Sequence, residues 1–324
     1  MINYIKMAPF SGLSGFGGGA AGLALGGIDS GPPYQGSGDW YGNTGVWIGG
    51  SKDNVGPNNT IDYKSLSNTN NATDFGDTTA AAIYFAAGGG SDMAVAANSD
   101  GDIDYISNIA STGNATSFGS LGTNRSDSAM SSNGTRGLIS GGNASNAASD
   151  VIEYFHFDTI GSTWAFGNLS QARWALASTG SDSRSLAACG TNGSAQNTID
   201  YNDYATPATS TDFGDMQFSA YGSSCCSDNT YAVISAGWVG SYSSEIKYVT
   251  IDTPGNSSNF GNLSGNTWYR CGACSNGDTG VWGGGRGQND SDVINNRDIS
   301  NGGSAYDMGD LTVARSVPGS CSGN

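Results

Sequence analysis

One short sequence pattern occurs six times along the chain, and it constrains the fold more than any other feature. Its first part is an isoleucine followed by a polar residue and usually a tyrosine. Successive isoleucines are 42, 49, 47, 47 and 48 residues apart: Ile61, Ile103, Ile152, Ile199, Ile246 and Ile294. Its second part is a Phe-Gly pair, which becomes Met-Gly in the last unit: Phe75, Phe118, Phe166, Phe213, Phe260 and Met308. A repeat of this length is one supersecondary unit that cannot bury its apolar face alone, so the units must stack on one another.

The composition favours strands over helices. Glycine is very frequent, at 52 residues, and charged residues make up only 12% of the chain. Glutamate, a good helix former, occurs only as Glu153 and Glu245,. Aromatic residues at 10% and a regular apolar repeat indicate a packed fold rather than disorder,.

Each repeat unit contains four candidate strands. In the clearest unit they are Ala172–Thr179, Ser185–Gly190, Thr198–Tyr201 and Thr211–Met216, with Gly, Ser, Asn and Asp turns between them,. Four short antiparallel strands joined by tight turns form one blade of a β-propeller. The sequence therefore predicts an all-β, six-bladed β-propeller.

The strand count predicts how the ring closes. The last strand of the chain, at residues 313–320, has no later strands to pair with, whereas the three strands at residues 45–77 lack a first strand. We expect these two segments to pair, giving 24 strands in six blades, with the C-terminal strand closing the N-terminal blade. Residues 1–39 then form a Gly-rich extension outside the 40–324 propeller, and a seventh irregular blade built from residues 1–39 is the alternative.

The net charge of −16 bears on partners. Phosphate binding needs a surface rich in Lys and Arg, so the charge disfavours nucleic acid and anionic membrane surfaces as partners. The sequence has no run of 18 apolar residues, and we expect no membrane insertion,.

Six cysteines invite a disulfide or zinc interpretation. Cys226, Cys274 and Cys321 are 48 and 47 residues apart, so they occupy one column of the repeat. We expect members of one column to lie on equivalent strands, far apart in the ring and unpaired. Cys271 and Cys274 have metal-like spacing but lack a second pair, which favours small buried core residues over zinc. No cofactor or metal is expected.

The sequence offers few candidates for catalytic residues. His156 is the only histidine, and its place in a strand favours a structural role over a catalytic triad,. Most aspartates belong to repeated columns, which serve the fold or its rim, whereas a catalytic acid would be singular. Arg173 and Arg315 share a column with Arg125 close to it, so they too follow the repeat rather than a sialidase-like cluster. The loop Asn98–Asp102 approaches a calcium-binding pattern, but turn formation explains it better. We expect no enzyme and no catalytic residues.

Aromatic side chains are the better functional candidates. Trp47 and Trp282 share a column of the second strand and are expected to pack between blades. Four others lie near loops of the fifth unit: Trp238, Tyr242, Trp268 and Tyr269. Exposed aromatic rings beside Asn and Asp suit sugars, which have apolar faces and hydroxyl edges. These four are the candidate ligand-binding residues, and core packing is the alternative.

One unit resembles the kelch repeat. It contains the Gly-Gly strand end Ile139–Gly142, the tyrosine strand Val151–Tyr154, then Trp164, Leu169 and Arg173. In kelch repeats a strand ending in Gly-Gly is followed by a strand with Tyr, a Trp, a short turn and an Arg-led strand. The other units have Thr or Ser where Trp164 stands. The resemblance covers about residues 40–324; it implies a propeller and says nothing of function.

Other segments resemble repeats in virion structural proteins of marine cyanobacterial phages. They are Ser111–Gly119 and Asp307–Arg315, together with the Gly-rich opening Lys6–Gly27. The resemblance implies a non-enzymatic, tail-fibre-like virion protein, made in the host cytoplasm and displayed on tail or capsid. Its expected partners are other virion proteins, bound through residues 1–39, and the host surface. A glycan-binding adhesin is the alternative, followed by a glycan-cleaving enzyme.

Overall fold

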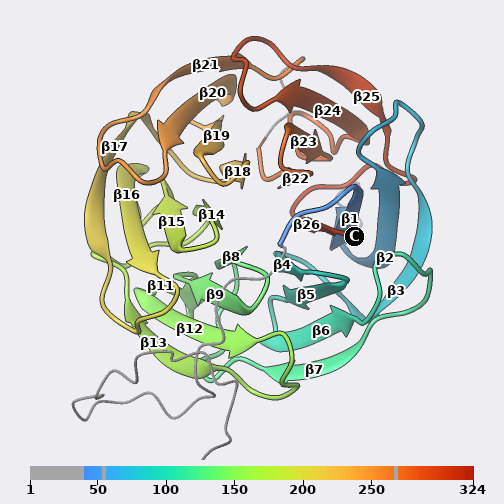
Figure 1. The fold of residues 1–324 in the computed structure, drawn as a ribbon, viewed down its shortest axis with the longest axis horizontal. Coiled ribbons are helices and arrows are strands. Elements are labelled where there is room, and N and C mark those ends of the chain that lie inside the picture. Colours follow the sequence, from blue (N-terminus) through green and yellow to red (C-terminus); the bar gives the residue numbers. More distant parts are fainter. Residues whose placement is uncertain (1–39, 53–55, 266–268) are drawn as a thin grey trace, which may run out of the picture.

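The computed structural model describes residues 40–52, 56–265 and 269–324, and these form a ring of six four-stranded antiparallel sheets (Figure 1). We name the sheets blades A to F in chain order. The predicted six-bladed β-propeller is confirmed. The structure contains no helix within the described ranges, and therefore none that could cross a membrane.

Blades A to C hold the first half of the chain. From the axis outward, blade A contains β26 (Gly319–Gly323), β1 (Thr44–Lys52), β2 (Gly56–Ser65) and β3 (Thr73–Ala82). Blade B contains β4 (Ala86–Gly90), β5 (Met93–Ala97), β6 (Asp102–Ile106) and β7 (Thr116–Ser120). Blade C contains β8 (Ala129–Ser132), β9 (Arg136–Ser140), β12 (Val151–His156) and β13 (Trp164–Asn168). A small hairpin, β10 (Asn143–Ala144) and β11 (Ala147–Ala148), lies between β9 and β12 in the chain.

Blades D to F follow the same plan. Blade D contains β14 (Ala177–Gly180), β15 (Arg184–Ala188), β16 (Gln196–Asp203) and β17 (Thr211–Ala220). Blade E contains β18 (Ser224–Ser227), β19 (Tyr231–Trp238), β20 (Tyr242–Thr250) and β21 (Ser258–Asn262). Blade F contains β22 (Gly272–Ser275), β23 (Thr279–Gly283), β24 (Val293–Asp298) and β25 (Tyr306–Asp310).

The C-terminal strand closes the ring, as predicted. Strand β26 pairs antiparallel with β1, from Thr44 opposite Gly323 to Ile48 opposite Gly319. The first and last parts of the described chain therefore share one sheet, and blade A cannot form without both.

The innermost strands begin later than the sequence predicts. The expected strand at residues 172–179 is β14, which starts at Ala177, and the strand expected at 313–320 is β26, which starts at Gly319. The physical reason is a turn before each strand. Ala175 and Val317 adopt left-handed backbone angles, with φ of 49° and 54°, which interrupt an extended strand,.

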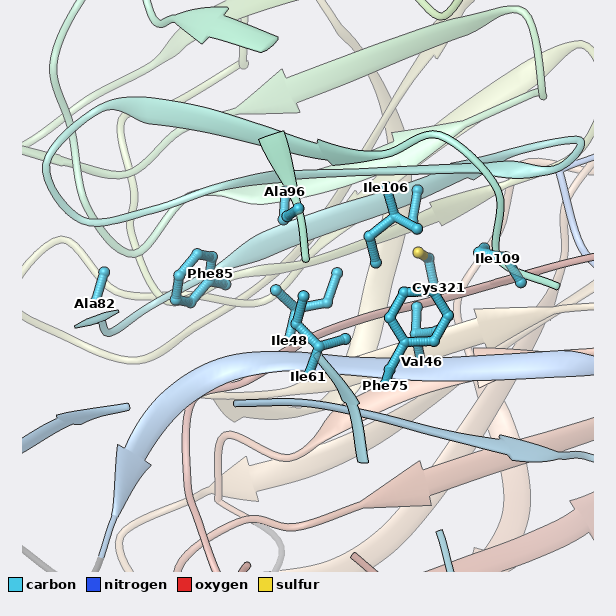
Figure 2. Close-up of a cluster of buried hydrophobic side chains, with 12 residues drawn as sticks. Val46, Ile48, Ile61, Phe75, Ala82, Phe85, Ala96, Ile106, Ile109 and Cys321 are labelled. Carbon is cyan, nitrogen blue, oxygen red and sulfur yellow. The ribbon is translucent and has the colours of Figure 1, made fainter. Parts of the chain in front are cut away.

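The hydrophobic core lies between blades rather than within them. Six clusters of buried side chains occupy the six junctions between neighbouring blades. Figure 2 shows the junction of blades A and B, where Ile61 of β2 and Phe75 of β3 pack with Ile106 of β6. Each repeat thus buries its apolar face on the next one, which is why the repeat alone predicts the fold.

The two parts of the repeated pattern meet in the same place in every blade. In blade A, Ile61 pairs with Gly76 and Asp62 with Asp74, so Phe75 is the extra residue of a β-bulge,. In each of the other five blades, an equivalent register shift follows the isoleucine of the repeated pattern. All six of these isoleucines are at most 1% exposed. The bulge turns the Phe or Met side chain into the junction with the next blade.

The cysteines of one repeat column lie closer together than the sequence predicts. Cys226, Cys274 and Cys321 lie on β18, β22 and β26, which are innermost strands that contact one another around the axis. Members of this column are therefore neighbours rather than far apart, because an innermost position brings equivalent strands together. All six cysteines are free, and Cys271 and Cys274 are buried core residues as predicted. Burial raises the pKa of the Cys274 thiol to about 12, so it stays protonated and weakly nucleophilic,.

Candidate functional site

Three of the four predicted ligand-binding residues come together at one end of blades E and F. Trp238 ends β19 and Tyr242 begins β20, and the tight hairpin between them places the ring centroids 5.0 Å apart at 84°. Tyr269 lies in the segment that leads into blade F, with its ring 6.1 Å from that of Tyr242. Trp268, the fourth predicted residue, lies outside the described residues.

Tyr221 is a fourth member that the sequence interpretation missed. Its ring centroid lies 5.8 Å from that of Tyr269, at 88°, and 6.5 Å from that of Trp238. Tyr221 and Tyr269 are 48 residues apart and occupy the same place before β18 and β22, so the repeat itself was the available signal. We call Tyr221, Trp238, Tyr242 and Tyr269 the aromatic cluster.

The aromatic cluster is a surface feature held by its own edge-to-face contacts. All four rings are half-buried, and Val239, in the turn between Trp238 and Tyr242, is 38% exposed. Edge-to-face packing fixes the orientation of such rings. Burial raises the pKa of the Tyr269 phenol, which therefore remains a neutral hydrogen-bonding group. Trp47 and Trp282, by contrast, are fully buried in the junctions between blades, as predicted.

A cleft of ≈590 Å³ opens beside the aromatic cluster. Its walls are the β19–β20 turn of blade E and the β23–β24 loop of blade F. It is lined by Ser241, Tyr242, Gln288, Asn289, Asp290, Ser291 and Asp292. The described lining residues include two carboxylates and no Lys or Arg, so the cleft is polar and negatively charged.

A pocket at one end of the propeller axis, which we call the mouth of the channel between the innermost strands, lies beside the aromatic cluster; a second, separate pocket lies further along the axis. Six residues with left-handed φ, one before each innermost strand, surround the axis there: Tyr84, Asp127, Ala175, Gly222, Arg270 and Val317. The Arg270 guanidinium forms two bonds across the ring to the Asp127 carboxylate, at 2.9 and 3.0 Å, and lies over the Tyr84 ring at 4.5 Å. Burial raises the pKa of the Asp127 carboxyl, and Arg270 acts in the opposite direction. This ion pair spans the mouth of the channel.

Hydroxyl groups line the channel. Ser132, Ser227, Ser275 and Ser322 occupy equivalent positions on innermost strands. Each donates its hydroxyl to a main-chain carbonyl of the preceding blade. These bonds tie the blades together around the axis, so the serine column is structural.

The repeated acids and arginines form buried ties within the ring. Arg125 pairs with Glu153 at 3.2 Å, Arg173 with Asp200 at 3.0 Å, and Arg315 with Asp62. The three arginines thus lie in blades C, D and A, each with its own carboxylate, and do not form the cluster that a sialidase needs. The carboxylates also accept main-chain N–H groups from the loop that enters the blade.

The remaining candidates have structural environments. His156 is fully buried on β12, with Nε2 3.3 Å from Nη2 of Arg136 and its ring against Tyr154. The Asn98 side chain accepts the N–H groups of Asp100 and Asp102, so the turn interpretation of this loop is confirmed,. Within the described ranges, no three His, Cys, Asp or Glu side chains gather in a way that would hold a metal ion.

Comparison with known proteins supports the architecture. No protein-family model matches the chain, and no curated protein matches it by sequence. Among solved structures, one described as "Structure of YjhT" superposes with a TM-score of 0.63 and 11% identity, covering 75% of this chain and 88% of that one. At this identity the likeness concerns the fold alone.

Proposed function

We propose that this protein is a non-enzymatic structural component of a phage particle, displayed on the tail or the capsid. The proposal rests on the resemblance of segments such as Asp307–Arg315 to virion structural proteins. A rigid closed ring with inter-blade ties and polar loops suits a displayed building block. We also propose a kelch-like origin for the repeat, from the Gly-Gly, Tyr, Trp164 and Arg173 pattern of one unit.

One observation carries the proposal that the protein is not an enzyme: its buried arginines and carboxylates are paired with one another. The Arg173–Asp200 pair and its two counterparts lie inside blades and hold the loop that enters each blade to its strands. Charged groups held in such pairs with no exposed surface are not available to a substrate.

The location of the protein in purified particles tests this proposal directly. We expect the protein to co-purify with virions at a fixed stoichiometry, and an antibody against the 40–324 ring to label the particle exterior. Antibody against a known internal virion protein, applied to intact particles, is the control for permeability. Absence of the protein from particles would reject the proposal.

We further propose that residues 1–39, which lie outside the described residues, attach the ring to other virion proteins. A variant that lacks residues 1–39 should remain folded, with an unchanged melting temperature, and should fail to incorporate into particles. Incorporation at the wild-type level would exclude this role for the segment.

A second candidate function, a glycan-binding adhesin that meets the host surface, is favoured by the aromatic cluster and the adjoining cleft. Ring faces beside carboxylate and carboxamide groups match the apolar faces and hydroxyl edges of sugars. A glycan array with the purified protein separates this function from a purely architectural one. Release of reducing sugar from a bound glycan would instead favour a glycan-cleaving enzyme.

A further inference from the structure

We propose that the cleft between blades E and F binds uncharged sugars and selects against acidic ones. This inference rests on the glycan-binding form of the proposed function, and it adds the place, the chemical class of ligand and the basis of selectivity.

The size and the walls of the cleft fit a small polar ligand. Its volume of ≈590 Å³ falls within the range of small-molecule sites, about 300–1,000 Å³,. Tyr242 supplies one aromatic wall, and its ring is held by contacts with Trp238, edge-to-face, and with Tyr269. A ring that is already fixed loses little conformational entropy on binding. The opposite wall carries the exposed carboxamides of Gln288 and Asn289 and the exposed carboxylate of Asp292, which suit the hydroxyl edge of a stacked sugar.

The charge of the cleft decides which sugars it takes. Neither Asp290 nor Asp292 forms an ion pair with any described residue, and neither carboxylate oxygen of Asp290 has a hydrogen-bond partner among them. The Asp290 oxygens are shielded from solvent, so a ligand in the cleft meets Asp292 rather than Asp290. Asp292 is exposed and accepts hydroxyl donors directly,. A sugar carboxylate meets repulsion from the exposed Asp292 carboxylate, and the net charge of −16 adds to it,.

The Asp290 side chain is not repeated in blade D. In the corresponding loop of blade D, Ala195 stands at the bridge position that Asp290 has in blade F. There the Gln196 amide donates to Asn192 at 3.0 Å and to the Ser194 carbonyl at 2.8 Å, so these polar groups bond within their own loop. Asp290 is therefore not required by the repeat, whereas the Asp292 position also carries an aspartate, Asp150, in blade C.

The test is calorimetric titration of the full-length protein with two sets of oligosaccharides. One set ends in glucose, galactose or N-acetylglucosamine, and the other ends in glucuronic or N-acetylneuraminic acid. We expect measurable binding only of a member of the uncharged set.

Tyr242→Ala should weaken that binding by ~10-fold or more, and Tyr242→Phe, which keeps the ring, by less than ~3-fold. Asp292→Lys should raise the affinity for the acidic set relative to the uncharged set. Tyr306→Ala, which removes a 53% exposed tyrosine of β25 outside the cleft, should change nothing.

Each other outcome of the titration rejects one stated part of the inference: the selectivity, the location of the site or sugar binding itself. Preference for the acidic set rejects the selectivity and leaves glycan binding standing. Binding that survives Tyr242→Ala unchanged rejects the location. Binding of neither set rejects both this inference and the adhesin function, while the location of the protein in particles still tests the virion proposal separately. If Tyr242→Ala melts early, Tyr242→Phe and Asp292→Lys carry the test.

Discussion

At the scale of single residues, buried charges explain why some columns of the repeat are fixed and others vary. Arg173 and Asp200 both have fully buried side chains and bond to each other at 3.0 Å. In blade E the same column carries Lys247, which pairs with the half-exposed Glu245 at 3.1 Å. The same sequence position therefore forms a fully buried pair in one blade and a pair with a half-exposed partner in the next.

Removal of one member of the fully buried pair should be far more damaging than removal of Lys247. Arg173→Met leaves the Asp200 carboxylate buried without a cation, and we expect a loss of ~3 kcal/mol in the free energy of unfolding. Lys247→Met should change it by ~0.5 kcal/mol or less, because the Glu245 carboxylate left behind is 52% exposed and stays hydrated,. Urea denaturation of both variants measures the difference. Equal effects would contradict the structural role of the tie.

Lys64 should make stability depend on pH in the alkaline range. Its Nζ donates to the main-chain carbonyls of Asn68 and Met308, at 3.2 and 2.9 Å. Burial lowers its pKa from 10.5 to about 8, against the opposing effects of Cys274 and Asp307. Because the folded-state pKa is the lower one, the charged amine costs stability. This cost is full below about pH 8 and disappears as the pH rises towards 10.5,.

The Lys64→Met variant isolates this effect. The difference in free energy of unfolding, variant minus wild type, should fall by ~2 kcal/mol between pH 7.5 and pH 10. Lost hydrogen bonds shift the difference by a constant and do not alter its slope. Urea denaturation at several pH values gives the slope, and a flat difference would show that the Lys64 pKa is the same in both states.

At the scale of the strand, the Phe-Gly bulge is both a core element and a joint between blades. The Phe enters the apolar junction, and the Gly lets the next blade approach. In blade C, a Cβ on Gly167 would lie 2.0 Å from the carbonyl oxygen of Ala208 in the neighbouring blade. Beside it, the Ser210 N–H donates to the Asn168 carbonyl at 2.7 Å, which ties the two blades at the perimeter.

A single methyl group at this joint should therefore be destabilising. We expect Gly167→Ala to lower the free energy of unfolding by ~1–3 kcal/mol, because main-chain atoms must shift to make room. Gly255→Ala is the matched control, since a Cβ there meets nothing within 4 Å, and it should stay within ~0.5 kcal/mol of wild type,. Thermal or urea denaturation compares them, and a neutral Gly167→Ala would mean that the joint is looser than the structure shows.

At the scale of the whole molecule, closure of the ring depends on one short strand. Strand β26 covers the inner edge of β1, and Cys321 fills part of the core between blades A and B. The closing contacts continue at the perimeter, where the Ala72 N–H of blade A donates to the Asp310 carbonyl of blade F at 2.8 Å. An open ring would expose an unpaired strand edge and an apolar junction.

Deletion of residues 319–324 should therefore prevent stable folding of the whole ring rather than loosen one blade. We expect the truncated protein to aggregate or to lose its cooperative thermal transition, as followed by size-exclusion chromatography and circular dichroism. The variant that lacks residues 1–39 is the matched truncation, and it should melt like wild type. A soluble monomer with wild-type melting after removal of 319–324 would refute closure by β26.

Most of the architecture could be predicted from the sequence because it depends on periodicity. The six Ile and Phe-Gly columns determined the number of units, their strand order and the pairing of the two chain ends, since each unit needs neighbours to bury its apolar face. Strand limits could not be predicted as well. Local composition does not reveal that Ala175 and Val317 take left-handed angles, which depend on contacts with other blades.

The candidate site divides in the same way. The sequence by itself determined that Trp238, Tyr242, Trp268 and Tyr269 lie near loops of the fifth unit. Only the tertiary structure decided that Tyr221 joins them, that the Asp290 loop faces Tyr242 across a cleft, and that Arg270 bonds to Asp127 across the axis. A repeat fixes what is alike in every blade, whereas these contacts join residues of different blades whose meeting depends on the curvature of the closed ring.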